Sequence, residues 1–199
     1  SFAHARTRVQ ALADCTLQVR RGEFVSLIGP SGCGKSTLLR IVGGLLEPDA
    51  GQVVVDGRSP RANRREKRFG FVPQTPALLP WLTARANIEL ALELRGIPRA
   101  ERRQRATGLL ELVHLGDAGA KRPHELSGGM RQRASLARAL GQDRPVLLMD
   151  EPFAALDALT RIKMQALVGE LCQKHQPAVL LVTHDVDEAI LLADRVVVL

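Results

Sequence analysis

A glycine-rich loop at residues 29–37 carries the clearest chemical signal in the sequence. The loop reads GPSGCGKST, directly after the apolar run FVSLI and directly before the helical run LLRIVGGLL. Gly29, Gly32 and Gly34 allow backbone angles at which successive N–H groups point into one concavity, and the following helix adds the positive end of its dipole. The pattern G-x-x-x-x-G-K-S between a strand and a helix therefore predicts a site for a nucleoside triphosphate.

The polar side chains of this loop have separate expected tasks. Lys35 should reach the β- and γ-phosphates, Ser36 should ligate Mg²⁺, and Thr37 should steady the α-phosphate. The predicted cofactor-binding residues of the loop are Gly29, Pro30, Ser31, Gly32, Cys33, Gly34, Lys35, Ser36 and Thr37.

Two adjacent carboxylates end the apolar run VLLMDE at residues 146–151. Because neighbouring side chains of a strand point to opposite faces, Asp150 and Glu151 cannot perform the same task. We expect Asp150 to hold Mg²⁺, directly or through water, and Glu151 to polarise the attacking water as the general base.

Two more polar residues follow apolar runs. His184 comes after VLLVT and just before a helix start at Asp185. At the carboxyl end of a parallel strand it would face the same crevice as the phosphate loop, so we expect it to contact the γ-phosphate and assist catalysis. Gln74 follows FGFV, and its amide can bridge the metal and the attacking water.

The segment LSGGMRQR at residues 126–133 offers a second anion site. Ser127, Gly128 and Gly129 open a helix, so a hydroxyl and exposed N–H groups meet there. An ordinary serine N-cap followed by flexible glycines gives the same pattern, and these residues alone favour that simpler interpretation.

Short apolar runs alternate with longer helical patterns, which predicts an α/β fold with a largely parallel sheet. Between residues 74 and 142 the pattern predicts helices without strands. One runs from Thr83 to Arg95, a second follows it to Val113, and a third runs from Ser127 to Leu140. We interpret residues 74–142 as a helical subdomain inserted into a core of residues 1–73 and 143–199. The predicted strands are Thr16–Val19, Phe24–Ile28, Gln52–Val55, Phe69–Val72, Val146–Met149, Val179–Val182 and Val196–Leu199.

Composition limits the classes of protein that this chain can be. With 199 residues and 45% hydrophobic residues, it suits one globular domain. It lacks an apolar run of the roughly 18 residues that span a bilayer, and it lacks the layout of a signal peptide. Its three separated cysteines fit a reducing compartment. We therefore expect a cytosolic chain. The net charge of +7 gathers in two clusters without aromatic residues, which favours solvated faces over a nucleic-acid site. The clusters are Arg58, Arg61, Arg64, Arg65, Lys67 and Arg68, and Arg99, Arg102, Arg103 and Arg105.

The order of these motifs resembles the ABC ATPase family along essentially the whole chain: the phosphate loop, Gln74, LSGGM, VLLMDEP, ALD and His184. The resemblance implies a RecA-like phosphate-loop NTPase core with an antiparallel β portion and an inserted helical subdomain. It implies ATP and Mg²⁺ as cofactors, and a head-to-tail dimer in which Ser127 and Gly129 complete the ATP site of the partner, with Asp157 communicating across the interface. It also assigns the adenine stack to Phe2, and it implies that a C-terminal piece follows Leu199.

Three functions fit this resemblance. The chain could be an importer ATPase on separate permease subunits, a soluble ABC ATPase acting on nucleic acid or ribosomes, or the ATPase domain of an exporter. LLPWLT, MDEPFAALD and THDVDEAI resemble the import branch, closest to nitrate, sulfonate and taurine importers. We therefore predict a peripheral ATPase on the cytoplasmic side of the membrane that forms a homodimer, docks on permease subunits, serves a solute-binding protein indirectly and binds no nucleic acid.

Overall fold

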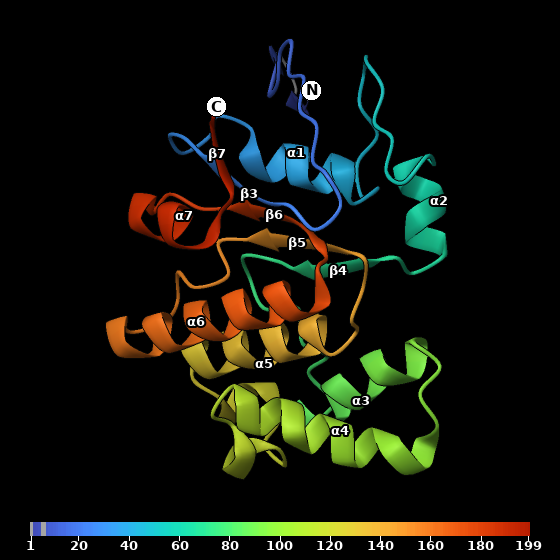
Figure 1. The fold of residues 1–199 in the computed structure, drawn as a ribbon, viewed down its shortest axis with the longest axis vertical. Helices are drawn as coiled ribbons and strands as arrows, with labels where there is room; N and C mark the ends of the chain where they lie inside the picture. Colours follow the sequence, from blue (N-terminus) through green and yellow to red (C-terminus); the bar gives the residue numbers. More distant parts are fainter. Residues whose placement is uncertain (1, 5–6) are drawn as a thin grey trace.

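A parallel five-stranded sheet forms the centre of the computed structural model, which describes residues 2–4 and 7–199, with side chains from residue 10 onward (Figure 1). The strand order is β4-β5-β6-β3-β7, and every neighbouring pair is parallel. The strands are β3 (Phe24–Ile28), β4 (Phe69–Val72), β5 (Val146–Asp150), β6 (Ala178–Val182) and β7 (Arg195–Val198). The strands predicted at these five places are confirmed.

The central strands are apolar throughout because helices cover both faces of the sheet. On β5, Leu148 packs into one buried cluster with Leu39 of α1 (Lys35–Val42), whereas Leu147 and Met149 pack into another. That second cluster also holds residues of α5 (Gly128–Leu140) and α6 (Ala158–His175). Figure 1 shows α1 above the sheet and α5 and α6 below it. Alternate side chains of one strand thus serve two separate cores.

Three helices below the sheet confirm the helices predicted between residues 83 and 140. They are α3 (Ala84–Leu94), α4 (Arg99–Leu112) and α5. The Thr83 hydroxyl accepts a hydrogen bond from the N–H of Ala86 at 3.1 Å, and Ser127 caps α5 in the same way. These N-caps satisfy backbone donors that the first helical turn leaves free, which is why the helices begin there.

The predicted antiparallel β portion is wrong, because the main sheet is parallel throughout. Thr16–Val19 forms no strand, and Gln52–Val55 contributes only an isolated bridge between Val55 and Arg58. Thr16 of the first segment and Gln52 and Val53 of the second line a cavity of about 690 Å³. Leu17 and Val19 do pack on the core between exposed neighbours. The alternation of polar and apolar residues therefore indicates that one face of the segment is buried, and it does not indicate pairing with another strand.

Several elements lie outside the predicted set. Two three-residue strands, β1 (Phe2–His4) and β2 (Thr7–Val9), form a separate antiparallel pair. The helix α2 (Pro60–Arg65) begins after an N-cap at Ser59 with proline at its first position, a signal that was present in the sequence. The 3₁₀ turns η1 (Gly116–Ala118) and η2 (Pro123–Glu125) also lie outside this set, whereas α7 (Val186–Leu192), with Asp185 as its N-cap, confirms the helix start predicted there.

The first basic cluster forms ion pairs with acidic residues nearby. Arg58 pairs with Glu66, and Arg68 pairs with Asp56. Such exposed pairs add little to stability, but they reduce the positive field of the cluster. Among the described residues, no helix has both the length and the apolar character needed to cross a membrane.

A buried asparagine holds the loop that precedes α3. The side chain of Asn87, 1% exposed, accepts a hydrogen bond from the N–H of Leu79 at 2.8 Å. Its amide nitrogen donates to the carbonyls of Leu79, Leu82 and Thr83 at 3.2, 3.3 and 3.0 Å. Trp81 lies in this loop and is 67% exposed. The loop is thus fixed from beneath while its tryptophan faces outward.

We predict that Asn87→Leu destabilises the fold. Leucine fills the same volume but leaves the N–H of Leu79 and its neighbouring carbonyls without a partner, a loss of about 1–3 kcal/mol. Urea unfolding should show a lower midpoint. The exposed Gln104→Leu on α4 is the control and should change stability by less than about 0.5 kcal/mol. Equal stability of the two variants would contradict a structural role for Asn87.

Candidate nucleotide site

The phosphate loop joins β3 to α1 through glycines with left-handed backbone angles. Gly32 has φ 84° and Gly34 has φ 103°. A Cβ at position 34 would lie 2.3 Å from the carbonyl oxygen of Ala11, whereas one at position 32 would meet no atom within 4 Å. Gly34 is therefore required by close packing, and Gly32 keeps the outer side of the loop open to a ligand.

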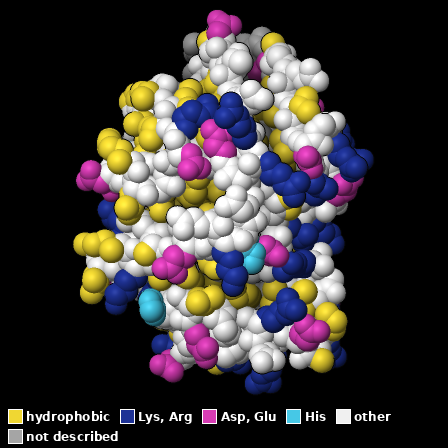
Figure 2. Space-filling view, viewed as in Figure 1, with side chains coloured by type: hydrophobic (Ala, Val, Ile, Leu, Met, Phe, Trp, Pro, Cys, Tyr) yellow, Lys and Arg dark blue, Asp and Glu magenta, His cyan; other side chains and the backbone are white. Residues whose placement is uncertain are grey.

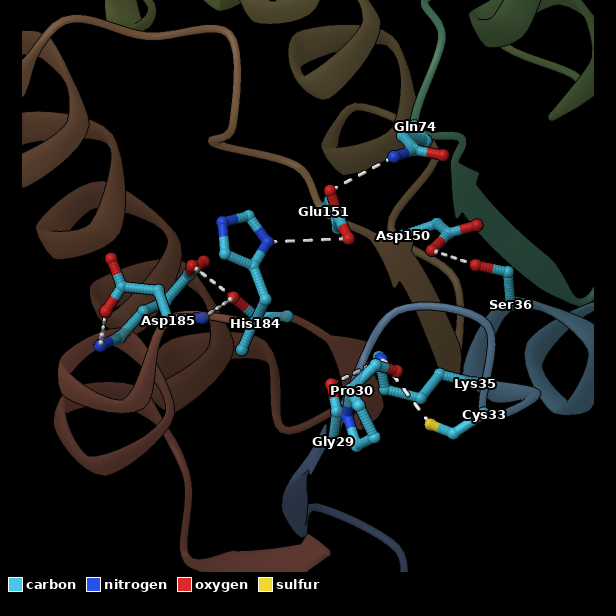
Figure 3. Close-up of polar contacts among 12 residues, drawn as sticks. Gly29, Pro30, Cys33, Lys35, Ser36, Gln74, Asp150, Glu151, His184 and Asp185 are labelled. Atoms are coloured by element: carbon cyan, nitrogen blue, oxygen red, sulfur yellow. Dashed lines mark hydrogen bonds and ion pairs between the residues drawn. The ribbon is translucent and has the colours of Figure 1, made fainter. Parts of the chain in front are cut away.

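Lys35 lies inside this loop, as predicted. Its ammonium donates hydrogen bonds to the carbonyls of Gly29 at 2.7 Å and Pro30 at 2.8 Å, and it lies 3.6 Å from the sulfur of Cys33 (Figure 3). Lys35 is only 7% exposed. The positive charge of this ammonium, at the start of a helix, suits a polyanion such as a triphosphate.

Ser36 and Asp150 meet across the site. The Ser36 hydroxyl donates to a carboxylate oxygen of Asp150 at 2.9 Å, and Asp150 is 2% exposed. Burial raises the pKa of Asp150, while the Ser36 hydroxyl, Arg40 and Lys35 oppose this shift. Two oxygen ligands side by side, one of them a carboxylate, are the donors that Mg²⁺ prefers. The residues present therefore fit the predicted metal.

Glu151 contacts the other two residues that were predicted to be catalytic. The Gln74 amide donates to one carboxylate oxygen of Glu151 at 3.1 Å, and the Nδ1 atom of His184 lies 3.5 Å from the other (Figure 3). Gln74 follows β4, Glu151 follows β5, and His184 follows β6. The carboxyl ends of three adjacent parallel strands thus bring these residues together.

The alternation of side chains along a strand does not explain why Asp150 and Glu151 point to different partners. Glu151 lies just beyond β5, and its φ of 45° is in the left-handed region, where non-glycine residues are uncommon. Its N–H donates to the carbonyl of Val182 at 2.8 Å. A turn of the backbone, rather than the alternation of a strand, therefore directs Glu151 towards His184 and leaves Asp150 with Ser36.

The structure keeps the Ser127 segment away from the phosphate loop. Ser127 caps α5 by accepting from the N–H of Met130 at 3.2 Å, and α5 lies on the opposite side of the sheet from α1 (Figure 1). A Cβ on Gly129 would lie 3.2 Å from the carbonyl of Ala155, whereas one on Gly128 would meet open space. Ser127, Gly128 and Gly129 therefore lie at a capped helix start on the far side of the sheet from the phosphate loop of their own chain.

Two predicted residues remain. Asp157 caps α6 by accepting from the N–H of Thr160 at 3.0 Å, and this hydrogen bond lowers the pKa of Asp157. Phe2 lies in β1, and the adenine stack assigned to it falls on a side chain outside the described part of the structure.

Comparison with known proteins identifies the family. The family model described as "ABC transporter" matches residues 12–154. The chain belongs to the ABC transporter family. The taurine import ATP-binding protein of Mesorhizobium japonicum is 50% identical over 189 residues, which cover 95% of this chain and 73% of that protein. The aliphatic sulfonates import ATP-binding protein of Xanthomonas axonopodis pv. citri is 51% identical over 191 residues, which cover 96% of this chain and 75% of that one.

A solved structure is similar over the full length of this ABC transporter family chain. It is a dimeric ATP-binding cassette in a post-hydrolysis state, bound to ADP and Pi, with a TM-score of 0.92 and 36% identity. The similarity covers 100% of this chain and 90% of that one. The family resemblance read from the sequence, including its import branch, is confirmed.

Sequence reasoning missed one buried acid beneath His184. Glu188, 5% exposed, accepts a hydrogen bond from the Thr183 hydroxyl at 2.7 Å, and its other oxygen has no partner among the described residues. Its N–H donates to Asp185 at 3.0 Å. Burial raises the pKa of Glu188 to about 7, and the charge of Asp185 adds to the shift. The sequence DVDEA at residues 185–189 carries no signal that one of its acids is buried.

We predict that Glu188→Gln makes the fold less sensitive to pH. Because the pKa of Glu188 in the folded chain lies above the ordinary value of 4.5, its stabilising contribution is complete below that value and is lost as the pH rises towards about 7. The variant should gain stability over wild type between pH 5 and pH 8, by at most about 3 kcal/mol.

Melting temperatures of the two proteins across this range test the prediction. Asp187→Asn, an exposed acid on the same helix, is the control and should follow wild type. A constant difference between wild type and Glu188→Gln at every pH would contradict titration of Glu188 as the cause.

Proposed function

We propose that the chain is the ATP-hydrolysing subunit of an ABC importer. The observation that carries this proposal is Glu151, which contacts Gln74 and His184 at the sheet edge that also holds Lys35 and the Ser36–Asp150 pair. The names of the relatives, which describe ATP-binding proteins for taurine and sulfonate import, support the same function.

In this proposal the phosphate loop holds ATP. Backbone N–H groups of residues 29–37 and the start of α1 bind the phosphates, Lys35 contacts the β- and γ-phosphates, and Thr37 steadies the α-phosphate. Ser36 and Asp150 would hold Mg²⁺, with Gln74 near it, and the metal would neutralise charge on the phosphates. The adenine partner proposed for this site is Phe2.

Glu151 acts as the general base in the proposed reaction. Its carboxylate takes a proton from the attacking water, and the amide of Gln74 holds one of its oxygens in place. With Nδ1 turned towards Glu151, the Nε2 atom of His184 is left for the γ-phosphate. A positioned base of this kind contributes roughly 10²–10⁴-fold to the rate.

The second anion site implies a partner chain. Because Ser127, Gly128 and Gly129 lie on the far side of the sheet from their own phosphate loop, we propose that they contact ATP held by a second subunit. A head-to-tail homodimer would then bury two ATP molecules, with Asp157 at the interface. The dimeric cassette bound to ADP and Pi supports this arrangement.

We further propose that residues 74–142 act as a helical subdomain that couples the ATP site to permease subunits. Trp81 is the proposed docking residue, because it is exposed on a loop held by Asn87 and tryptophan is frequent in interface hot spots. The chain would then lie at the cytoplasmic side of the membrane as a peripheral subunit, served indirectly by a solute-binding protein. The proposed cargo is a small solute of the nitrate, sulfonate or taurine type.

Replacing the general base tests the enzymatic proposal. We expect Glu151→Gln to bind Mg-ATP normally, to lose turnover by about 10²-fold or more, and to accumulate as an ATP-dependent dimer. Phosphate release, nucleotide binding and light scattering should be measured together. Glu170→Gln, an exposed change on α6, is the control and should retain full activity. Turnover of Glu151→Gln within a few-fold of wild type would exclude Glu151 as the base.

Replacing Trp81 tests the docking proposal. We expect Trp81→Ala to leave the melting temperature and the ATP affinity of the isolated chain unchanged, because the side chain is 67% exposed, and to uncouple transport in the assembled complex. Ile162→Ala, which removes a side chain 61% exposed on α6, is the matched control. Normal transport by Trp81→Ala, or a large loss of stability, would refute docking through Trp81.

A further inference from the structure

A cavity of about 610 Å³ lies at the edge of the sheet opposite the phosphate loop. Gly70 of β4 and Leu147 of β5 line it near the amino ends of their strands, and the ends of α5 and α6 and the middle of α4 form its walls. Its volume is in the range of small-molecule sites. Among the residues whose side chains the structure describes, none of those assigned to ATP, Mg²⁺ or catalysis lines this cavity.

The interior of the cavity is apolar. Leucines from five elements line it, at positions 92, 109, 112, 140, 147 and 171. Cys172 adds a sulfur, and burial raises the pKa of this thiol to about 11, so it stays uncharged at neutral pH. Gly108 lines the cavity from α4, and a Cβ there would meet no atom within 4 Å. These walls suit an alkyl chain.

The rim of the cavity is strongly basic. Arg95, Arg105, Arg144, Lys174 and His175 line it, against the single acid Asp143. In Figure 2, Lys and Arg side chains and a histidine surround hydrophobic side chains where α5 and α6 end in Figure 1. The rim therefore presents excess positive charge beside an apolar interior.

Two cations of this rim, Arg144 and Lys174, form no ion pair among the described residues. Asp143 already pairs with Arg95 at 2.7 Å and with His175 at 2.9 Å, and Arg105 pairs with Glu101 at 2.9 Å. Arg144 has no ion pair among the described residues, and its Nε and Nη2 atoms are buried without a hydrogen-bond partner. Burial, and then the charge of Arg95, lower the pKa of Arg144, whereas the charge of Asp143 opposes this shift. Arg144 is half-buried as a whole, but buried donor atoms of a charged group are costly unless an acceptor meets them.

The backbone at the rim is also unusual. Asp143 has φ 46°, and Gln176, between two lining residues, has φ 53°. Non-glycine residues in this region are strained, and such strain tends to gather at ligand sites. The two left-handed residues place Asp143 and His175 in contact across the cavity mouth.

We propose that this cavity binds a small amphipathic anion, with its anionic head on Arg144 and Lys174 and its alkyl chain among the leucines. The apolar walls and the basic rim together select this class of ligand. An inorganic anion would leave the apolar walls empty, and an alcohol would leave Arg144 unpaired. A nucleotide is a poor occupant, since no Phe, Tyr or Trp among the described residues lines the walls. The site is separate from the ATP site, so the proposal does not depend on ATP hydrolysis.

Titration of the full chain with 1-hexanesulfonate, followed by ¹⁵N amide shifts, tests this proposal. The probe keeps its charge at every working pH. We expect saturable shifts at Gly70, Gly108 and Gly141, which line the cavity, and none at Gly32 and Gly34 of the phosphate loop. Inorganic sulfate and 1-hexanol should each bind more weakly than the probe, by about tenfold or more.

Two variants and a control assign the contacts. Arg144→Gln should weaken binding by about tenfold or more, the loss of one charge-assisted contact. Gly108→Leu should fill the cavity from α4 and abolish binding without unfolding the chain. Arg103→Gln, on the exposed side of α4, should bind as wild type does. Absence of cavity shifts, equal binding of sulfate, or unchanged affinity in both cavity variants would overturn the proposal, whereas loss of ATP binding would not bear on it.

Discussion

The register of the parallel sheet is the constraint on which the site depends. Asp150 lies opposite Val182 in the pairing of β5 with β6, so the two strands end at the same level. Glu151 and His184 follow those ends directly, and the phosphate loop follows β3, which pairs with β6 on its other side. A slip of one residue would turn the apolar side chains of a strand to the wrong core and would also separate Glu151 from His184.

The backbone of Glu151 illustrates how the site uses strain. A left-handed residue that is not glycine costs roughly 1–2 kcal/mol, and here the cost falls on the proposed base. The hydrogen bond from its N–H to Val182 holds the turn, and Gln74 holds the carboxylate. Because both ends of the residue are fixed, the carboxylate is directed into the site without depending on a bound ligand.

Much of this arrangement could be predicted because its signals are local. A buried parallel strand is a short apolar run with a polar residue after it, and the helix starts carry their own caps, as at Thr83 and Ser127. The failures have physical reasons as well. Thr16–Val19 has the alternation of a strand, but pairing depends on a neighbour that the alternation does not specify. The φ of Glu151 and the burial of Glu188 arise from tertiary packing, for which a single sequence carries no periodic signal.

One arginine joins the proposed catalytic segment to the proposed partner site. Arg161 of α6 lies 3.4 Å from a carboxylate oxygen of Asp185, next to His184, and it donates to the carbonyl of Leu156 at 3.3 Å. Residues 155 and 156 in turn pack against Gly129. A movement of the Ser127 helix on contact with a partner's nucleotide would therefore press on the same short segment that Arg161 ties to His184. Because these contacts are continuous through packed atoms, the half-site proposed for a partner chain is in mechanical contact with the residues proposed to act in catalysis.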